Sequence, residues 1–185
     1  MNKAVFLDRD GTIIEDVGYL NNPAEIKFIP GSIEAIKMLN ENGFKVVVIT
    51  NQSGVARGLI AEDMLQTIDK IIQKKILNGH AHLDRIYYCP HHPEAGHYPY
   101  KQECGCRKPA PGMIQKAQKD LNIDLAKSFM IGDKISDIEA GQRVGMKNIL
   151  VLSGRGRGEK ERIKTSPDFI AQNLKQAAEW ILNNQ

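Results

Sequence analysis

The sequence predicts an α/β protein with a three-layer, doubly wound parallel sheet. Short apolar runs alternate with stretches of helical periodicity along nearly all of its 185 residues. Some runs, such as residues 46–49, are β-branched and apolar on both faces, which is typical of a parallel strand covered by helices on both sides. Polar clusters follow three of the runs, at residues 8–12, 50–53 and 133–137. Because ligands bind outside the carboxyl ends of the strands in such folds, we expect these clusters to form one site.

The first half of the chain predicts two strands and two helices. A strand at residues 4–7 precedes a helix that begins at residues 30–32, a Pro-Gly-Ser sequence, and stops at Gly43. A second strand at residues 46–49 precedes an amphipathic helix that ends near Gly79. The inward positions of these two helices are Ile33, Ile36, Leu39, Leu65, Ile68, Ile72 and Ile76.

The second half predicts three more strands and two more helices. A strand at residues 86–88 is followed by a helix and then by a strand at residues 129–131, which ends in Gly-Asp. A further strand at residues 148–152 precedes the last helix, for which Asn173 and Gln176 resemble a capping box. The inward positions of these helices are Ile114, Ala117, Leu121, Leu174, Ala178 and Ile181.

The composition indicates one domain. With 42% hydrophobic residues, residues 1–185 can bury a single proper core. The formal net charge of +3 is spread without a run of like charges, which argues against a nucleic-acid-binding tail and suits anionic small substrates. No apolar stretch reaches the length of a membrane span, and the odd number of cysteines, 3, argues against a disulfide framework. We therefore expect a soluble cytoplasmic protein that binds neither membrane nor nucleic acid.

The most informative motif is Asp8-Arg9-Asp10-Gly11-Thr12, directly behind the first strand. Residues two apart in an extended chain point to the same side, so we expect the carboxylates of Asp8 and Asp10 to converge while Arg9 points elsewhere. Two carboxylates forced together repel unless a cation lies between them, and such a pair suits Mg²⁺ beside a nucleophile. The alternative is a plain strand end, in which Gly11 and Thr12 only form a turn.

A second pattern lies in the segment of about residues 89–106. Cys89-Pro90-His91 and Cys104-Gly105-Cys106 supply three thiols and an imidazole as two close pairs. Cys₃His is a recognised structural zinc set, and four protein ligands leave no position for water or substrate. We therefore expect a zinc-binding loop with a structural role. Unrelated free thiols or a redox pair remain the alternatives, and His92 or His97 could replace His91 as the ligand.

Four segments, in this order along the chain, resemble the four motifs of the haloacid dehalogenase superfamily of phosphatases. The segments are Asp8-Arg9-Asp10-Gly11-Thr12, Thr50-Asn51-Gln52-Ser53, Arg107-Lys108-Pro109 and Gly132-Asp133-Lys134 with Asp137. The resemblance is closest to the branch of D-glycero-D-manno-heptose 1,7-bisphosphate phosphatases, whose Thr-Asn-Gln-Ser-Gly and Cys-Arg-Lys-Pro segments are similar. An equivalent loop binds Zn²⁺ in that branch, and the match falls on Cys89, His91, Cys104 and Cys106.

The resemblance implies an aspartyl-phosphate mechanism. Asp8 is expected to attack phosphorus, and Asp10 to protonate the leaving oxygen and then activate water. Asp8, the backbone carbonyl of Asp10 and Asp133 are expected to hold Mg²⁺. Thr50 and Lys108 are expected to bind the oxygens of the transferring phosphoryl group.

The resemblance also implies the substrate contacts. No interval between the motifs is long enough for a large cap domain, so recognition must come from loops, including a flap at residues 16–19. The expected substrate-binding residues are Asp16, Tyr19, Asn51, Gln52, Ser53, Arg107 and Lys134. Two further cations, Arg155 and Arg157, are interpreted as ordinary solvated charges. The role of Asp137 is left open between a supporting residue of the site and a helix N-terminal acid.

The expected function is removal of the C7 phosphate from a heptose bisphosphate. The product, heptose 1-phosphate, serves nucleotide-activated heptose synthesis for the lipopolysaccharide core or another glycan in this branch, and the enzymes are expected to be monomers. A histidinol-phosphate phosphatase is the nearest alternative, because it shares the Asp-x-Asp-Gly-Thr motif and a similar zinc loop. A non-catalytic zinc-binding interaction module is the alternative of a different class. Such a module would have no use for the set of Asp8, Asp10, Thr50, Lys108 and Asp133.

Overall fold

The core of the protein is a single parallel sheet of six strands. The computed structural model describes residues 1–162 and 166–184. The strands are β1 (Ala4–Leu7), β2 (Lys45–Asn51), β3 (Arg85–Cys89), β4 (Phe129–Gly132), β5 (Lys147–Val151) and β6 (Phe169–Ala171). Their order across the sheet is β3-β2-β1-β4-β5-β6, so the chain reverses its direction of winding between β1 and β4. Ligands bind at such a switch point in open α/β sheets.

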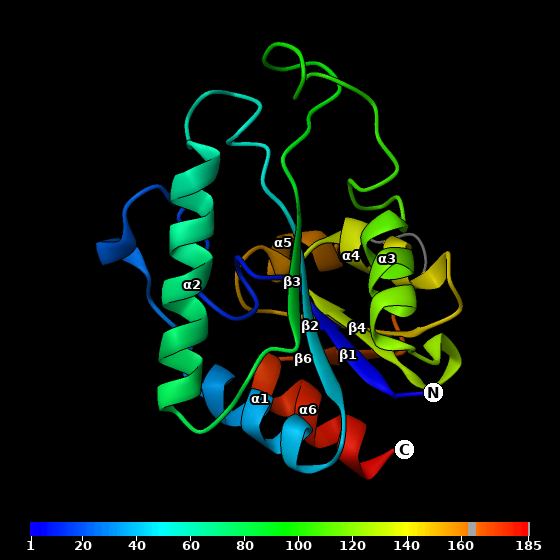
Figure 1. Ribbon diagram of the computed structural model, residues 1–185. Helices are drawn as coiled ribbons and strands as arrows, with labels where there is room; N and C mark the ends of the chain where they lie inside the picture. The colour runs from blue at the N-terminus through cyan, green and yellow to red at the C-terminus, as the bar shows by residue number, and fades with distance from the viewer. Residues whose placement is uncertain (163–165, 185) are drawn as a thin grey trace.

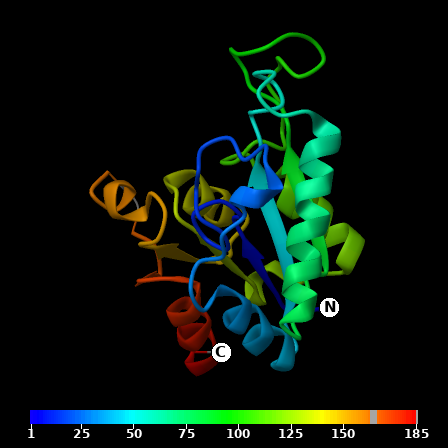
Figure 2. The same ribbon diagram turned by 90° about the vertical axis from the view of Figure 1, so that its left-hand side faces the viewer.

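Helices cover both faces of this sheet and complete three layers (Figures 1 and 2). The helices are α1 (Ser32–Glu41), α2 (Glu62–Asn78), α3 (Gly112–Leu121), α4 (Ile135–Gln142), α5 (Gly156–Lys160) and α6 (Leu174–Asn183). Two short 3₁₀ turns, η1 (Pro23–Glu25) and η2 (Leu125–Lys127), lie in the connections. One core cluster packs α1, α2 and α6 against one face of the sheet, and a second packs α3 and α4 against the other.

The alternation of side chains along β1 explains why both faces need helices. Val5 and Leu7 belong to the core under α1, α2 and α6, whereas Ala4 and Phe6 belong to the core under α3 and α4. All four are fully buried, and Phe6 pairs with Val47 of β2 on one side and with Met130 of β4 on the other. A strand that is buried on both faces and paired on both edges holds the residues after it rigidly.

The predicted fold class is confirmed, and the five predicted strands and four predicted helices are all present. Helix α1 begins after Gly31 and is followed by Gly43, which has a left-handed φ of 78°, as the stop signal predicts. At the start of α6, Asn173 accepts a hydrogen bond from the N–H of Gln176, but the Gln176 side chain bonds the N–H of Gln172. The predicted capping box is therefore only half formed.

Two of the described α-helices and one strand are not in the prediction: α4, α5 and β6. Helix α4 contains Gly141 and two acidic residues, and β6 has only three residues, so neither has a clear hydrophobic period. In the connections β1–α1 and β3–α3 the described chain forms loops, the turn η1 and isolated bridges, with no cap built of further helices or sheets. Among the residues that the structure describes, no helix has the length and hydropathy to cross a membrane.

Candidate active site

The carboxyl ends of β1 and β4 bring three buried aspartates together. Asp8 follows β1 directly, while Asp133 and Asp137 lie after β4 and in the first turn of α4. One carboxylate oxygen from each lies within 4.8 Å of the others, and the three residues are 0 to 3% exposed. So much negative charge in a dry site requires cations beside it.

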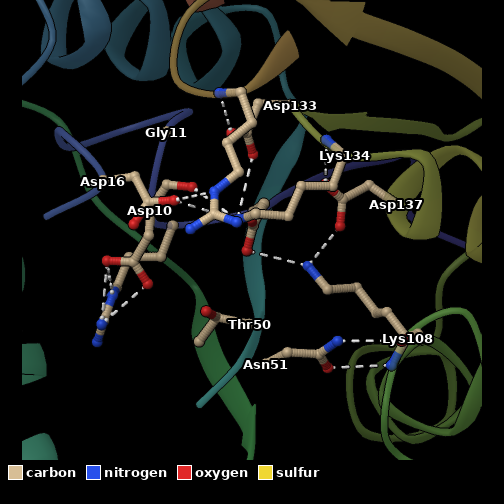
Figure 3. Close-up of polar contacts among 12 residues, drawn as sticks. Asp10, Gly11, Asp16, Thr50, Asn51, Lys108, Asp133, Lys134 and Asp137 are labelled. Carbon is tan, nitrogen blue, oxygen red and sulfur yellow. Dashed lines mark hydrogen bonds and ion pairs between the residues drawn. The ribbon is translucent and has the colours of Figure 1, made fainter. Parts of the chain in front are cut away.

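Lys108 supplies the first cation, from the loop before α3. Its Nζ lies 3.0 Å from Oδ1 of Asp8 and 2.7 Å from Oδ1 of Asp137, and it donates to the carbonyl of Ile49 at 2.7 Å. The carboxamide of Asn51 fixes the Lys108 backbone by donating to its carbonyl and accepting from its N–H, both at 3.0 Å (Figure 3). Asn51 therefore positions Lys108, a role that the motif does not reveal; its predicted contact with substrate stays a prediction.

Lys134 supplies the second cation, from the turn between β4 and α4. Its Nζ lies 3.2 Å from Oδ2 of Asp8, 3.3 Å from the backbone carbonyl of Asp10 and 3.5 Å from Oδ1 of Asp133. Figure 3 shows Lys108 and Lys134 reaching the acidic cluster from different sides. Asp137 holds this turn as well, because its Oδ2 accepts the N–H of Lys134 at 3.0 Å. Asp137 is thus part of the site and not only a helix N-terminal acid.

The aspartates of the cluster differ in pKa, because the two lysines and burial act on them to different extents. Burial favours a higher pKa for Asp8, but Lys108 and Lys134 outweigh it and hold that pKa well below the usual range. Burial, together with the charge of Asp8, raises the pKa of Asp133 to about 7. Burial also raises the pKa of Asp137. Asp8 is therefore the ionised carboxylate of the group, which is the state that a nucleophile needs.

The carboxylate of Asp10 is held apart from this cluster. Arg9 donates from Nη2 to Oδ1 and Oδ2 of Asp10 at 3.1 and 3.0 Å, and Gln52 donates to Oδ2 at 2.7 Å. Gln52 also donates to Oγ1 of Thr50 at 2.8 Å. The sequence predicts that the carboxylates of Asp8 and Asp10 converge and that Arg9 points elsewhere. This prediction is wrong at Asp10, because Arg9 holds its carboxylate while the carboxylate of Asp8 joins Asp133 and Asp137. The strand β1 ends at Leu7, so the alternation of an extended strand does not continue through the turn.

Glycines enclose Asp133. Gly11 has a left-handed φ of 90°, and a Cβ there would overlap the carboxylate of Asp133; a Cβ at Gly154 would do the same from the turn after β5. Oδ2 of Asp133 accepts the N–H of Arg155 at 2.8 Å, whereas Oδ1 is buried without a hydrogen-bond partner. This buried oxygen has only the ammonium of Lys134 beside it, at 3.5 Å, and it lies near Asp8 and the carbonyl of Asp10, which fits a hard divalent cation with oxygen ligands.

A cavity of about 370 Å³ opens above this centre. Its lining residues are Asp10, Asp16, Gly18, Tyr19, Asn51, Gln52, Ser53, Gly54, Arg107, Lys108, Lys134, Ser136 and Arg155. Every predicted substrate-binding residue is in this lining, while Asp8, Thr50 and Asp133 are buried and absent from it.

The cavity includes Arg155, which the sequence interpretation treats as an ordinary surface charge. Its Nε lies 3.0 Å from Oδ2 of Asp16, so it joins the flap to the turn after β5. Its backbone N–H also holds Asp133. The position of Arg155 four residues after β5, at the edge where the other motifs end, is the signal that could have identified it.

The Cys/His cluster lies at the carboxyl end of β3, where the loop rises beyond the sheet (Figure 1). The three Sγ atoms are 3.2 to 3.6 Å apart, and Nδ1 of His91 is 3.4 and 3.8 Å from Cys106 and Cys89. The edges of a tetrahedral site with Zn–S bonds of about 2.3 Å are of similar size, about 3.8 Å. The bond shared with Cys89 lowers the pKa of Cys106 to about 5, which favours a thiolate.

The geometry selects His91 over its neighbour. Nε2 of His92 lies 3.0 Å from Arg57 and its Nδ1 accepts backbone N–H groups of Glu94 and Ala95, so its ring faces away from the thiols. His91 also connects the cluster to the cavity, because its carbonyl accepts a hydrogen bond from Nη1 of Arg107 at 3.3 Å. The residues present therefore fit a closed zinc site whose frame supports Arg107.

Comparison with known proteins identifies relatives across the whole chain. Residues 5–85 match the haloacid dehalogenase-like hydrolases, and residues 105–177 match a second, HAD-hydrolase-like family. The chain is 47% identical over 174 residues to the D-glycero-beta-D-manno-heptose-1,7-bisphosphate 7-phosphatase of Pasteurella multocida, with 94% of each chain covered. It is 41% identical over 183 residues to the enzyme of the same name from Escherichia coli K12, with 98% of this chain and 88% of that one covered.

Solved structures agree with the sequence comparison. The D,D-heptose 1,7-bisphosphate phosphatase of B. bronchiseptica, complexed with magnesium and phosphate, superimposes with a TM-score of 0.89 at 32% identity and 99% coverage of both chains. A putative HAD-like phosphatase from Mesorhizobium loti gives a TM-score of 0.84 at 33% identity, covering 98% of this chain and 85% of that one. With this fold, these motifs and these relatives, the chain belongs to the haloacid dehalogenase-like hydrolases, in the family of the D-glycero-beta-D-manno-heptose-1,7-bisphosphate 7-phosphatases.

Proposed function

We propose that the protein removes the C7 phosphate of D-glycero-β-D-manno-heptose 1,7-bisphosphate and leaves heptose 1-phosphate. The observation that carries this proposal is the ionised, buried carboxylate of Asp8, held between Lys108 and Lys134 beneath a cavity lined by further cations. The identity of 47% to a relative of that name supports the choice of sugar and of anomer.

In the first step, Asp8 forms a bond to phosphorus while the bond from phosphorus to the sugar oxygen breaks. Lys108 and Thr50 offer an ammonium and a hydroxyl to the phosphoryl oxygens, on which charge spreads in the transition state. Asp10, at the cavity wall, gives its proton to the leaving sugar oxygen. In the second step, Asp10 takes a proton from the water that attacks the phosphoryl group, and inorganic phosphate leaves while Asp8 is restored.

The residues fit Mg²⁺, which the complexed relative from B. bronchiseptica contains. Asp8, the carbonyl of Asp10 and Asp133 would hold it, because these three oxygens already converge on one ammonium. When bound, the metal supplies positive charge beside the phosphoryl group. Lys134 then becomes free to bind phosphate oxygens, which agrees with its predicted role as a substrate contact.

The second phosphate of the substrate needs its own cations. Arg107 and Arg155 line the cavity on different loops, and a guanidinium can bind a phosphate through two hydrogen bonds. Tyr19 and Asp16 belong to the flap, and Ser53 and Gln52 to the loop after β2, so we propose that they contact the sugar. If another sugar bisphosphate were the substrate, these contacts would differ, but the chemistry at Asp8 would be the same.

For the Cys/His loop we propose a structural Zn²⁺ on Cys89, His91, Cys104 and Cys106. This proposal is supported by the distances within the cluster and by the link from His91 to Arg107. We further propose that residues 1–185 act as one domain, as a cytoplasmic monomer. The three cysteines, which are free in the structure, suit a reducing compartment.

The proposal is tested by phosphate release in the presence of Mg²⁺. The substrates are both anomers of heptose 1,7-bisphosphate, fructose 1,6-bisphosphate and histidinol phosphate, and the control is the Asp8→Asn variant. We expect the β anomer to have the highest kcat/KM. Preference for histidinol phosphate would keep the mechanism and overturn the substrate, and activity that survives in Asp8→Asn would overturn the mechanism.

A further inference from the structure

The amphipathic helix α2 carries one carboxylate among its buried residues. Asp69 is 7% exposed and lies in the stripe of Leu65, Ile68, Ile72 and Ile76. Its partner is Arg9, which is 1% exposed and one of the largest fully buried side chains of the protein. Nη1 of Arg9 donates to Oδ1 of Asp69 at 2.9 Å. Helix α2, which carries none of the four motifs, thus reaches the centre of the site through one guanidinium.

The same guanidinium holds Asp10 on its other side. Nη2 of Arg9 is 3.0 Å from Oδ2 and 3.1 Å from Oδ1 of Asp10, and Nε is 3.3 Å from Oδ1. Because a guanidinium is planar and its donors are fixed, the position of Asp69 sets the plane in which the carboxylate of Asp10 can lie. Gln52 adds a third donor at 2.7 Å, so Asp10 cannot rotate without breaking several hydrogen bonds.

A buried ion network of this kind is poorly explained by stability alone. Apolar side chains of similar volume at a buried ion pair are often as stabilising as the charges or more so. Burial favours a lower pKa for Arg9, yet Asp10 and Asp69 together outweigh it and keep the guanidinium charged. The geometry instead favours a role in orienting the carboxylate of Asp10, since the side-chain hydrogen bonds of Arg9 all go to Asp10 or Asp69.

We propose that Asp69 is a positioning residue, which acts through Arg9 to hold the carboxyl group of Asp10 at the angle needed for proton transfer to the leaving oxygen. This inference rests on the proposed phosphatase function. In the step concerned, the bond from Asp8 to phosphorus forms, the bond to the leaving oxygen breaks with its electron pair on that oxygen, and the proton passes from Asp10 to it. Asp69 touches neither substrate nor phosphorus.

The choice of leaving group separates positioning from a merely structural role. A sugar alkoxide needs the proton of Asp10, whereas p-nitrophenolate leaves without one. The experiment measures kcat/KM for heptose 1,7-bisphosphate and for p-nitrophenyl phosphate, both with Mg²⁺, in the wild type and in Asp69→Ala. We expect a loss of about 10- to 100-fold for the sugar bisphosphate and less than about threefold for p-nitrophenyl phosphate.

The matched control is Asp84→Ala. Asp84 is also a mostly buried carboxylate with a cation partner, Lys45 at 2.8 Å, and it accepts the N–H of Val46 at the amino end of β2. We expect the Asp84→Ala substitution to lower the melting temperature without changing the ratio of the two kcat/KM values. A second variant, Arg9→Met with Asp69→Leu, replaces the ion pair by apolar side chains and guards against a failure of Asp69→Ala to fold. It should show the same selective loss.

The outcomes separate this inference from the function on which it rests. Equal losses on both substrates, or none, in a folded variant of an active enzyme would overturn the positioning role and leave the phosphatase intact. A wild type that hydrolyses neither ester would overturn the proposed function, and the inference with it. Selective loss on the sugar bisphosphate in both Asp69 variants, with Asp84→Ala unaffected, is the expected result.

Discussion

The acidic centre and the Cys/His cluster lie at carboxyl ends of the same sheet, yet they are built in opposite ways. The acidic centre collects hard oxygen donors from residues next to β1 and β4, and Lys108 and Lys134 form ion pairs with its three carboxylates. The cluster collects thiols and an imidazole from the last residue of β3 and the loop that follows it, and its four ligand atoms lie within 4.8 Å of one another. The first arrangement leaves room for substrate, and the second is closed.

This difference predicts which of the two regions needs its metal to keep its structure. The acidic centre stands on strands that are fully buried and paired on both edges, so its frame does not depend on a metal. The long connection from β3 to α3 has little secondary structure of its own among its described residues, so its frame depends on the cluster. We therefore expect changes at the two regions to separate activity from stability.

The largest expected effect is at Asp8. Asp8→Asn keeps the size of the side chain but removes the nucleophile, so kcat should fall by about 10⁴-fold or more. The melting temperature should change by only a few degrees, because Lys108 still faces Asp137 and Lys134 still faces Asp133. Steady-state phosphate release and circular dichroism check the two parts. A variant that unfolds would show that the charge of Asp8 is needed for folding and would contradict this expectation.

Lys108→Met is expected to affect both activity and stability. It removes one donor to the phosphoryl group, which should lower kcat by about 10²- to 10³-fold. It also leaves Asp8 and Asp137 without the ammonium that now lies 3.0 and 2.7 Å from them, so the melting temperature of the metal-free protein should fall. Lys119→Met, at an exposed position in the last turn of α3, is the control and should change neither quantity appreciably.

Cys104→Ser is expected to show the reverse pattern to Asp8→Asn. With one zinc ligand lost, the loop should loosen, the melting temperature should fall, and KM for the bisphosphate should rise by about tenfold because Arg107 loses its support. The affinity for Mg²⁺, measured by calorimetry, should not change. A zinc-stripped protein with wild-type KM and melting temperature would refute the structural role of the cluster.

The smallest expected effect concerns pH and the binding of Mg²⁺. The pKa of Asp133 is raised to about 7, so the folded metal-free state holds a proton that the unfolded state releases at lower pH. Its contribution to stability is present at acidic pH and is lost as the pH rises through about 7. A metal must displace that proton, so the affinity for Mg²⁺ should rise by about tenfold between pH 6 and 8. Calorimetric titration checks this, with Asp133→Asn as the non-binding control.

The sequence predicts the sheet well because apolar runs and glycine stops are local signals. Residues 46–49 and Gly43 need no knowledge of the rest of the chain to be interpreted. The candidate residues of the site are also recognisable, since the carboxyl ends of parallel strands meet at one edge. The sequence does not reveal pairings across long separations, such as Asn51 with the Lys108 backbone or Arg9 with Asp69.

Two local rules also fail at the site itself. Alternation along a strand predicts that Arg9 points away, but the strand has ended and the side chain returns to Asp10. Most arginines are solvated surface charges, so the sequence gives no reason to place Arg155 in the site. Its position depends on how the turn after β5 meets the turn after β4. Both errors occur where the backbone leaves regular structure, which is also where the chemistry is placed.

The ammonium of Lys134 touches Asp8, the carbonyl of Asp10 and Asp133, the three groups proposed to hold Mg²⁺. It therefore serves as an internal counter-ion, and binding of the metal is an exchange of one cation for another. A cell short of magnesium would then keep a reserve of folded but dormant enzyme, which regains activity when the supply returns, without any new synthesis. Purification in a chelator followed by addition of Mg²⁺ should recover full activity in the same way.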